Sequence, residues 1–320
     1  MTLPLVSIKM LAYNHENYIR QAIESCVMQQ TSFPYELVVI DDASQDRTPQ
    51  IIQGYADSHP EKIVPVLLVE NQQSKGRQFS IDSVLRHCQG KYIAFCEGDD
   101  YWTDPLKLEK QISLMEADPS VSMCFTAAWR EYLDASRKPH IKRYHRGDFC
   151  FPPRDVIQRL GSFADMVTVV VRKDIYLDIP EWYYLSPVGD VPIYLLAMLK
   201  GKVCYEDTTT AVHQSKVANS WTQSMDQDGQ RKAAVLKKMI AMLQAFDLET
   251  SFQYHAFVER RLNTHRIDLQ VFYEAYAENC KEDFSNFGLR EHLEFNFFKY
   301  LRSQTLWNKY QSLLRMLRIY

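Results

Sequence analysis

The chain has 320 residues, of which 46% are hydrophobic and 24% charged, and its formal net charge is -3 at pH 7. This composition is ordinary for a globular protein, the length fits one enlarged α/β domain, and the charge gives no broad basic field for nucleic acid. The seven cysteines form no CxxC pair, so we expect neither a zinc site nor a disulfide framework, and reduced thiols are the simplest interpretation.

The start of the chain has no basic segment followed by a long apolar core, so no signal peptide is predicted. No apolar run approaches the about 20 residues that a membrane-spanning helix needs. We therefore expect a cytoplasmic protein that is soluble, or at most peripheral at the cytoplasmic face of the inner membrane.

Aliphatic segments alternate with segments of helical periodicity through the first part of the chain. Strands are predicted at 5–11, 36–40, 63–69, 92–96 and 121–125. Helices are predicted between them at 16–30, 44–58, 76–88 and 104–117. Strands separated by helices are typical of βαβ units, and nearly continuous aliphatic strands are typical of a sheet covered on both faces. These patterns predict an α/β fold with a mostly parallel central sheet and flanking helices.

The remainder of the chain is less regular. The polar, basic and aromatic residues 129–151 are predicted to form a loop excursion. A strand is predicted at 166–171, a short helix at 192–200 and a strand at 202–206. From about residue 229 the pattern is helical to the end. We therefore expect one domain over 1–224, followed by a helical C-terminal extension over 225–320.

Polar clusters follow three of the predicted strands, at Tyr13-Asn14, at Asp41-Asp42 and at 97–100. Since parallel α/β sheets bind ligands beyond the carboxyl ends of their strands, we expect one site there, with the 129–151 loop over it. Glu97, Asp99 and Asp100 are three carboxylates within four residues, and like charges this close raise one another's pKa. Mg²⁺ or Mn²⁺, which prefer oxygen ligands, would neutralise them. A solvated acidic turn that caps the next helix is the alternative.

Several short segments follow one another in a familiar order: Val6-Ser7-Ile8, Tyr13-Asn14, Tyr18-Ile19, Val38 to Thr48, Gly90 to Ile93, Glu97 to Trp102 and Lys107-Leu108. Together they resemble a family 2 glycosyltransferase, and the resemblance covers about residues 4–220. It implies the GT-A fold, nucleotide-sugar donors and inversion, with a nucleotide-binding half at 1–125 and an acceptor-binding half at 126–224. The Glu-Gly-Asp-Asp-Tyr-Trp motif resembles enzymes that build bacterial capsule, O-antigen (lipopolysaccharide) or other surface glycans.

By this resemblance the nucleotide is bound by Ala12, Tyr13, Asn14 and Asp41. The Tyr13 ring can stack on a base, although packing against the next helix is the alternative. The Asp41 carboxylate can accept the imide N–H of uracil. Cytosine lacks that donor, whereas guanine and thymine carry a comparable one. A UDP-sugar is therefore the favoured donor, with GDP- and dTDP-sugars left open.

Glu97 and Asp99 occupy the two carboxylate positions of the family's Asp-x-Asp motif. The resemblance implies that Asp99 binds Mn²⁺ or Mg²⁺, which neutralises the diphosphate leaving group, and that Glu97 lies nearer the nucleotide. Glutamate at the first position is a departure that argues against direct metal contact by Glu97. Gly98 and Asp100 are assigned to the donor sugar, with metal-bound water as the alternative for Asp100. Ala211 to Gln214 lies where related sequences often have Tyr-Arg-x-His; the histidine is kept as His213 and the arginine is missing. His213 could be a metal or diphosphate ligand, or part of a polar loop.

Two pairs of residues have open assignments. Lys75 and Arg77 follow a segment that lacks the glycine of the family's Asn-x-Gly motif, and each could reach a phosphate or lie on a solvated surface. Trp102 and Trp221 are candidates for stacking on an acceptor sugar, and core packing is at least as favoured for each.

Asp190, in Gly189-Asp190-Val191-Pro192, begins a predicted helix. From the residues alone, a helix N-cap followed by proline in the first turn is favoured. The resemblance instead implies that Asp190 is the general base, because the family places its base at a Gly-Asp or Glu-Asp before a helix. Both roles are compatible if one carboxylate oxygen stays available to the acceptor hydroxyl.

The implied function is sugar transfer to a glycan or lipid-linked glycan. A catalytically inactive relative that binds sugar nucleotides or glycans within an assembly complex is the alternative, although Asp41, Asp99 and Asp190 together argue against it. A nucleotidyltransferase and a dinucleotide dehydrogenase are disfavoured because 11–15 contains no glycine. Residues 306–320 could form a membrane-surface helix, but ordinary helix packing is favoured.

Overall fold

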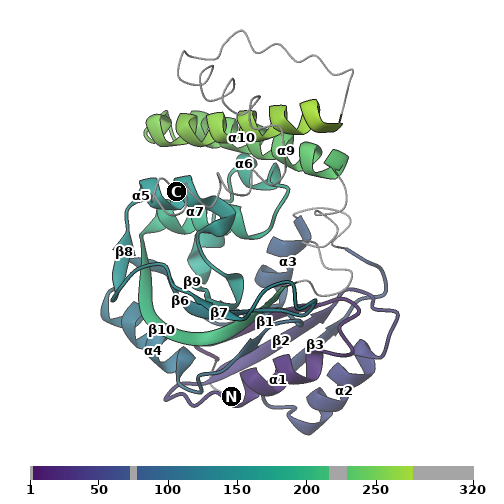
Figure 1. Cartoon of the computed structure of the whole chain (residues 1–320). Helices are drawn as coiled ribbons and strands as arrows, with labels where there is room; N and C mark the ends of the chain where they lie inside the picture. The colour runs from purple at the N-terminus through teal and green to yellow at the C-terminus, as the bar shows by residue number, and fades with distance from the viewer. Residues whose placement is uncertain (1–2, 73–77, 216–228, 277–320) are drawn as a thin grey trace. The chain divides into compact units, whose positions relative to one another are not determined.

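The computed structural model of the protein describes residues 3–72, 78–215 and 229–276 (Figure 1). Contacts within the chain divide it into a first unit, residues 1–156 and 160–223, and a second unit, residues 157–159 and 224–320. The first unit contains the β-sheet. In the second unit, the two long helices α9 (Gly229–Glu249) and α10 (His255–Tyr276) contact each other. Every described residue of the predicted site belongs to the first unit.

The described part of the first unit contains a sheet of ten strands. They are β1 (Val6–Ala12), β2 (Tyr35–Asp41), β3 (Ile63–Leu67), β4 (Tyr92–Phe95), β5 (Tyr101–Trp102), β6 (Val121–Tyr132), β7 (His140–Lys142), β8 (Phe149–Phe151), β9 (Val170–Arg172) and β10 (Lys202–Ser215). Their order is β3-β2-β1-β4-β9-β6-β10-β5, with β7 on β6 and β8 on β10. Pairing is parallel from β3 to β4 and between β6 and β10, and β9 is antiparallel to both of its neighbours.

Helices flank this sheet. They are α1 (Ile19–Val27), α2 (Thr48–Ser58), α3 (Gln78–His87), α4 (Lys107–Ala117), α5 (Pro153–Arg159), α6 (Glu181–Tyr184) and α7 (Asp190–Lys200). Three 3₁₀ turns, η2 (Leu160–Ser162), η3 (Met166–Thr168) and η4 (Lys173–Tyr176), lie between α5 and α6. The predicted α/β fold with flanking helices is confirmed.

The core explains why the first strands are so uniformly aliphatic. All seven residues of β2 are buried, as expected for a strand covered on both faces. On one face, alternate residues of β1 such as Ile8 and Met10 pack with Ile23 of α1 and Ile112 of α4. This packing holds the carboxyl ends of β1, β2 and β4 at one edge of the sheet.

The second half of the sheet differs from the prediction. Strands β6 and β10 are far longer than the predicted 121–125 and 202–206, because they pair with each other along most of their length. The predicted strand at 166–171 is a 3₁₀ turn followed by β9. The predicted loop excursion at 129–151 contains the end of β6 together with β7 and β8. These differences depend on pairing between distant segments, which local periodicity does not report.

The expectation that all cysteines are reduced is wrong for one pair, because Cys150 and Cys204 form a disulfide. The antiparallel register of β8 and β10 sets these two residues directly opposite each other. Cys26, Cys88, Cys96 and Cys124 are free and buried. Sequence spacing gave no sign of the pair, because 54 positions separate the two cysteines.

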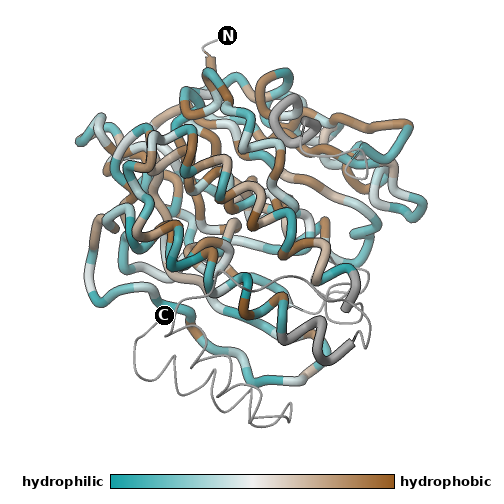
Figure 2. The backbone as a smooth tube through the Cα atoms, turned by 90° about the horizontal axis from the view of Figure 1, so that it is seen from above, coloured by the Kyte–Doolittle hydropathy of each residue, from teal (hydrophilic) through white to brown (hydrophobic). Residues whose placement is uncertain are grey.

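Among the described helices, none is long and apolar enough to cross a membrane. Figure 2 shows hydrophilic and hydrophobic residues interspersed along these helices. The candidate membrane-surface segment at 306–320 lies outside the described residues.

Candidate functional site

The loops that follow β1, β2 and β4 are joined by hydrogen bonds at one edge of the sheet. The backbone N–H of Gly98 donates to the carbonyl of Leu11 at 2.9 Å, and the N–H of Leu11 donates to the Glu97 carboxylate at 3.1 Å. On the other side of β1, the N–H of Asp42 donates to the carbonyl of Ala12 at 2.9 Å. The three predicted polar clusters are therefore in one place.

The loop after β1 is held against the loop after β2. The N–H of Asn14 donates to Ser44 Oγ at 2.8 Å, and Asn14 Oδ1 accepts from the N–H of Gln45 at 2.8 Å. Asn14 and Ala43 both have left-handed backbone, with φ of 56° and 62°. Such a conformation is uncommon for residues other than glycine, and it is concentrated at functional sites.

Asp41 and Tyr13 differ in exposure. Asp41 is 1% exposed, and its carboxylate accepts from both the N–H and the hydroxyl of Ser44. The carboxylate is thereby fixed in orientation, and each of its oxygens has a further lone pair. The Tyr13 side chain is 44% exposed, so it does not pack into the core and its ring is open to a ligand.

The acidic turn, residues 97–100 directly after β4, concentrates negative charge. Burial raises the pKa of Glu97, and repulsion from Asp99 adds to the shift. Burial also raises the pKa of Asp99, and repulsion from Asp100 adds to it. Both directions mean that the ionised turn lacks charge compensation, which a bound cation would supply.

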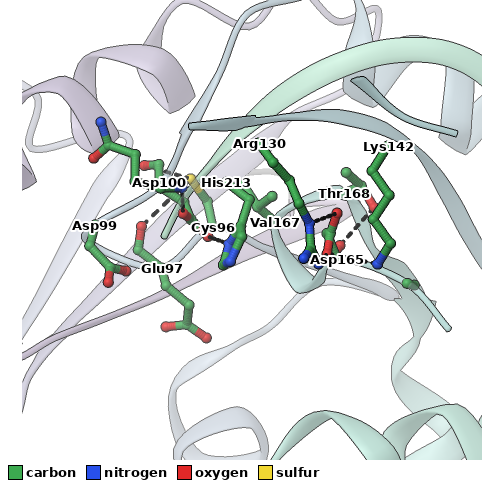
Figure 3. A network of polar contacts seen from close by, with 12 residues as sticks. Cys96, Glu97, Asp99, Asp100, Arg130, Lys142, Asp165, Val167, Thr168 and His213 are labelled. Atoms are coloured by element: carbon green, nitrogen blue, oxygen red, sulfur yellow. Dashed lines mark hydrogen bonds and ion pairs between the residues drawn. The ribbon is translucent and has the colours of Figure 1, made fainter. Parts of the chain in front are cut away.

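The Asp100 carboxylate is bound to residues of the neighbouring strand β10 (Figure 3). One of its carboxylate oxygens accepts from the N–H of Gln214 at 2.8 Å, and the other lies 3.2 Å from His213 Nδ1. Burial lowers the pKa of His213, but the charge of Asp100 and the hydrogen bond to it outweigh burial, so the net shift is upward. Asp100 therefore anchors the acidic turn to β10.

Asp99 is the carboxylate of this turn that stays available. Its side chain is 21% exposed, and one of its carboxylate oxygens lies 3.9 Å from His15 Nε2. His15 Nδ1 is buried and has no hydrogen-bond partner among the described residues. Sequence reasoning missed His15, which directly follows the Tyr13-Asn14 cluster and could have been noticed on that ground.

The carboxylates of the acidic turn suit a divalent cation that arrives together with the substrate. Within the described ranges, no group of three or more His, Cys, Asp or Glu side chains is arranged to hold a metal ion. Mg²⁺ sites typically use one or two carboxylates and complete the shell with substrate phosphates and water. Asp99, beside two further carboxylates, fits that pattern.

Asp190 is the first residue of α7. One of its carboxylate oxygens accepts from the N–H of Val191 at 2.8 Å. The other faces Gly161, where an added Cβ would lie 3.7 Å from it. The helix cap itself is Gly189, without a side-chain cap hydrogen bond. Asp190 therefore satisfies one backbone donor of the helix with one oxygen.

A cationic cluster that sequence reasoning missed lies beside His213 (Figure 3). Arg130 of β6 donates from Nε at 3.3 Å and from Nη2 to the Asp165 carboxylate. Lys142 of β7 donates to the same carboxylate at 3.2 Å. The basic character of 129–151 was a signal for it, but the partner Asp165 could not be identified from spacing.

Of the remaining predicted site residues, the structure describes Trp102. Trp102 is 2% exposed, and its indole N–H donates to the carbonyl of Val167 at 2.8 Å. Trp102 is therefore a core residue, so core packing, which the sequence favoured at least equally, is confirmed and the assignment to an acceptor sugar is corrected. Lys75, Arg77 and Trp221 lie outside the described residues.

Comparison with known proteins identifies the family. The family model for Glycosyl transferase family 2 matches residues 7–179, more than half of the chain. The uncharacterized protein Rv1520 of Mycobacterium tuberculosis is 33% identical over 230 residues, which are 68% of this chain and 60% of the relative. The chain thus spans less than two thirds of that relative's length.

A second relative has a descriptive name. The UDP-Glc:alpha-D-GlcNAc-diphosphoundecaprenol beta-1,3-glucosyltransferase WfgD of Escherichia coli is 39% identical over 111 residues, which are 35% of this chain and 41% of that protein.

Solved structures agree with this fold. S. aureus TarS 1-349 in complex with UDP-GlcNAc matches with a TM-score of 0.57 and 18% identity, over 91% of this chain and 78% of that one. The mannosyltransferase PcManGT of Pyrobaculum calidifontis, in complex with GDP-Man and Mn²⁺, matches with a TM-score of 0.52 and 15% identity, over 100% of this chain and 87% of that one. At such identities the likeness shows the fold alone, which is GT-A.

Proposed function

The chain belongs to glycosyl transferase family 2, and we propose that it moves a sugar from a nucleotide-sugar, with UDP-sugars favoured, to a hydroxyl of a glycan or lipid-linked glycan in surface polysaccharide synthesis. The proposal rests on one observation: Asp41 and the acidic turn with Asp99 lie at the same edge of the sheet, at the carboxyl ends of β1, β2 and β4. That edge is where parallel α/β sheets bind their ligands.

The nucleotide end of the donor is assigned to Tyr13, Asn14 and Asp41. The exposed Tyr13 ring is available for stacking on a base, and the fixed Asp41 carboxylate is available to the imide N–H of uracil. WfgD is named for UDP-Glc and the TarS complex contains UDP-GlcNAc, which supports a UDP-sugar. The PcManGT complex contains GDP-Man, so a GDP-sugar is the competing assignment.

The diphosphate is assigned to the acidic turn. Asp99 would hold Mg²⁺ or Mn²⁺, with His213 as a further ligand through the ring nitrogen that does not face Asp100. When bound, the cation supplies neutralisation of the diphosphate as it leaves. Asp100 and Glu97 keep the turn in place through their bonds to β10 and β1.

Asp190 is assigned as the general base. It would take the proton from the acceptor hydroxyl as that oxygen bonds to the anomeric carbon, from the face opposite the diphosphate. The bond between the anomeric carbon and the diphosphate breaks, the nucleoside diphosphate leaves, and the configuration inverts. The hydrogen bond from the Val191 N–H to one Asp190 oxygen supports the role, because it fixes the orientation of the carboxylate.

Calorimetric titration with UDP, GDP, CMP and dTDP, each with Mn²⁺ and again with EDTA, tests the proposal. We expect metal-dependent binding that is tightest for UDP. Tightest binding of GDP would change the donor class. Failure of all four nucleotides to bind would favour the inactive relative that binds glycans within an assembly complex.

A further inference from the structure

The cationic cluster beside His213 has more positive than negative charge. Arg130 and Lys142 share the single carboxylate of Asp165. In the part of the chain that the structure describes, neither cation has another carboxylate within salt-bridge distance. Asp165 is 3% exposed, whereas the two cations are 27% and 20% exposed. Within ion-pair distance the cluster therefore has two cations and one carboxylate, and both cations reach the surface.

The electrostatics of the cluster agree with this excess. Asp165 is buried, yet Lys142 and Arg130 together hold its pKa well below its usual range. Burial lowers the pKa of Lys142 to about 8, because its attraction to Asp165 is offset by repulsion from Arg130. Burial is the largest cause of the Lys142 shift, repulsion from Arg130 adds to it, and the carboxylates of Asp165 and Asp190 oppose it. A second anion would stabilise Lys142 in its charged form.

The cluster lies between the two parts of the proposed active site. The parallel register of β6 and β10 sets Arg130 beside His213, which contacts Asp100 of the acidic turn. On the other side, Lys142 interacts electrostatically with Asp190, the proposed base. An acceptor whose hydroxyl reaches Asp190 would therefore pass close to Lys142 and Arg130.

We propose that Lys142 and Arg130 bind a phosphoryl group of the acceptor, so that the acceptor is a phosphate-bearing glycan and not a neutral one. This inference rests on the proposed transferase function. It names the acceptor class and assigns two residues to its recognition. Asp165 is then a positioning residue that holds both cations toward the acceptor.

The donor groups of the cluster suit phosphate better than carboxylate. The Nε and Nη2 edge of Arg130, which forms the fork that fits a carboxylate, is already occupied by Asp165. The donors that remain are Arg130 Nη1 and the ammonium of Lys142, on separate side chains. A tetrahedral phosphoryl group offers three acceptor oxygens and up to two negative charges, and lysine binds such a group as a point charge.

The donor diphosphate is a poor occupant of this cluster. It is assigned to the carboxylates of the acidic turn, where a cation is needed to bind it, on the far side of His213 (Figure 3). Saturating UDP and Mg²⁺ would therefore leave the cluster open, and this allows a direct test.

The test is titration of the UDP- and Mg²⁺-saturated protein with glucose 1-phosphate, glucose and glucuronate. We expect glucose 1-phosphate to bind at least about tenfold more tightly than either of the others, as one charge-assisted contact implies. Lys142→Gln should remove that preference and Lys142→Arg should retain it. Lys202→Gln is the matched control, because it removes a lysine paired with Asp118 at the opposite end of β10 and should change nothing.

Equal binding of glucose 1-phosphate and glucose, or a preference that survives Lys142→Gln, would overturn the inference. Glucuronate binding as tightly as the phosphate would overturn it too, because the cluster would then be a carboxylate site. Thermal unfolding checks that Lys142→Gln folds, which we expect because Arg130 still pairs with Asp165. If UDP fails to bind, the proposed function fails, and the same titrations without UDP still test the phosphate preference. If UDP binds normally while the preference is absent, only the inference fails.

Discussion

His213 Nδ1 lies 3.2 Å from a carboxylate oxygen of Asp100, although 113 positions separate the two residues in the sequence. Together with the hydrogen bond from the N–H of Gln214, this contact fixes Asp100 to β10. The adjacent Asp99 has no such anchor among the residues described. Two neighbouring carboxylates thus have different tasks, one structural and one available for a cation.

Replacement of the proposed base separates binding from turnover. Asp190→Asn keeps the size of the side chain and an oxygen for the N–H of Val191, but it cannot take a proton. We expect UDP affinity to change less than about threefold and turnover to fall by roughly 10²- to 10⁴-fold, the usual contribution of a general base. Release of UDP from the UDP-sugar measures turnover. Turnover within a few-fold of wild type would leave Asp190 with a helix-end role only.

Two glycine substitutions have opposite expected effects. An added Cβ at Gly98 would lie 2.8 Å from His15 Nδ1 and 3.1 Å from the Ala12 Cβ, so Gly98→Ala must displace the His15 ring beside Asp99. We expect a turnover loss of roughly 100-fold, as small displacements of catalytic geometry can cause. Gly54→Ala, in α2 with nothing within 4 Å of the new Cβ, is the control. It should stabilise the protein by about 0.5–1 kcal/mol. Similar activity of the two variants would contradict this account of the Gly98 turn.

Asp165 should contribute to stability in a pH-dependent way. Asp165→Asn leaves two half-buried cations without their carboxylate, and we expect a loss of about 3 kcal/mol at pH 7, the lower end for breaking a buried ion pair. The folded-state pKa of Asp165 is lowered, so its contribution is present above the unfolded value of about 4. It is lost as the pH falls below that value. Chemical unfolding of both proteins at pH 7 and pH 3 measures this. A difference that is the same at both pH values would rule out the ion pair as its source.

The disulfide should strengthen the sheet around β8 and β10. It links residues 54 positions apart, and in the loop-closure account such a link stabilises by about 4 kcal/mol. Reduction with dithiothreitol should lower the unfolding midpoint of the wild type and leave that of Cys150→Ser unchanged. An identical response in the two proteins would mean that Cys150 and Cys204 are not paired in solution.

The sequence predicted the parts of the fold that local pattern determines. Strands β1 to β4, α1, α2 and α4 follow from aliphatic runs and helical periodicity, and the polar residues at the strand ends predicted one edge. The relation between Asp99 and Asp100 was not predictable, because both are exposed-looking carboxylates in a turn. Their different tasks depend on β10, which is more than a hundred residues away.

The second half of the site was less predictable for the same reason. Arg130 and Lys142 belong to a segment whose local pattern predicts a loop, and their partner Asp165 precedes a 3₁₀ turn whose local pattern predicts a strand. Trp102 has the composition of a sugar-stacking residue, but its position between α1 and β10 makes it part of the core. Register and burial, which no local pattern encodes, decide each of these cases.

We propose above that the acidic turn binds a metal-nucleotide complex through Asp99. Calorimetric titration of wild type and Asp99→Asn with UDP, each with Mn²⁺ and with EDTA, tests it most directly. We predict that Mn²⁺ strengthens UDP binding to the wild type by at least about tenfold, which is about 1.4 kcal/mol, and that Asp99→Asn abolishes this gain while the protein stays folded. An undiminished Mn²⁺-dependent gain in Asp99→Asn would contradict the assignment.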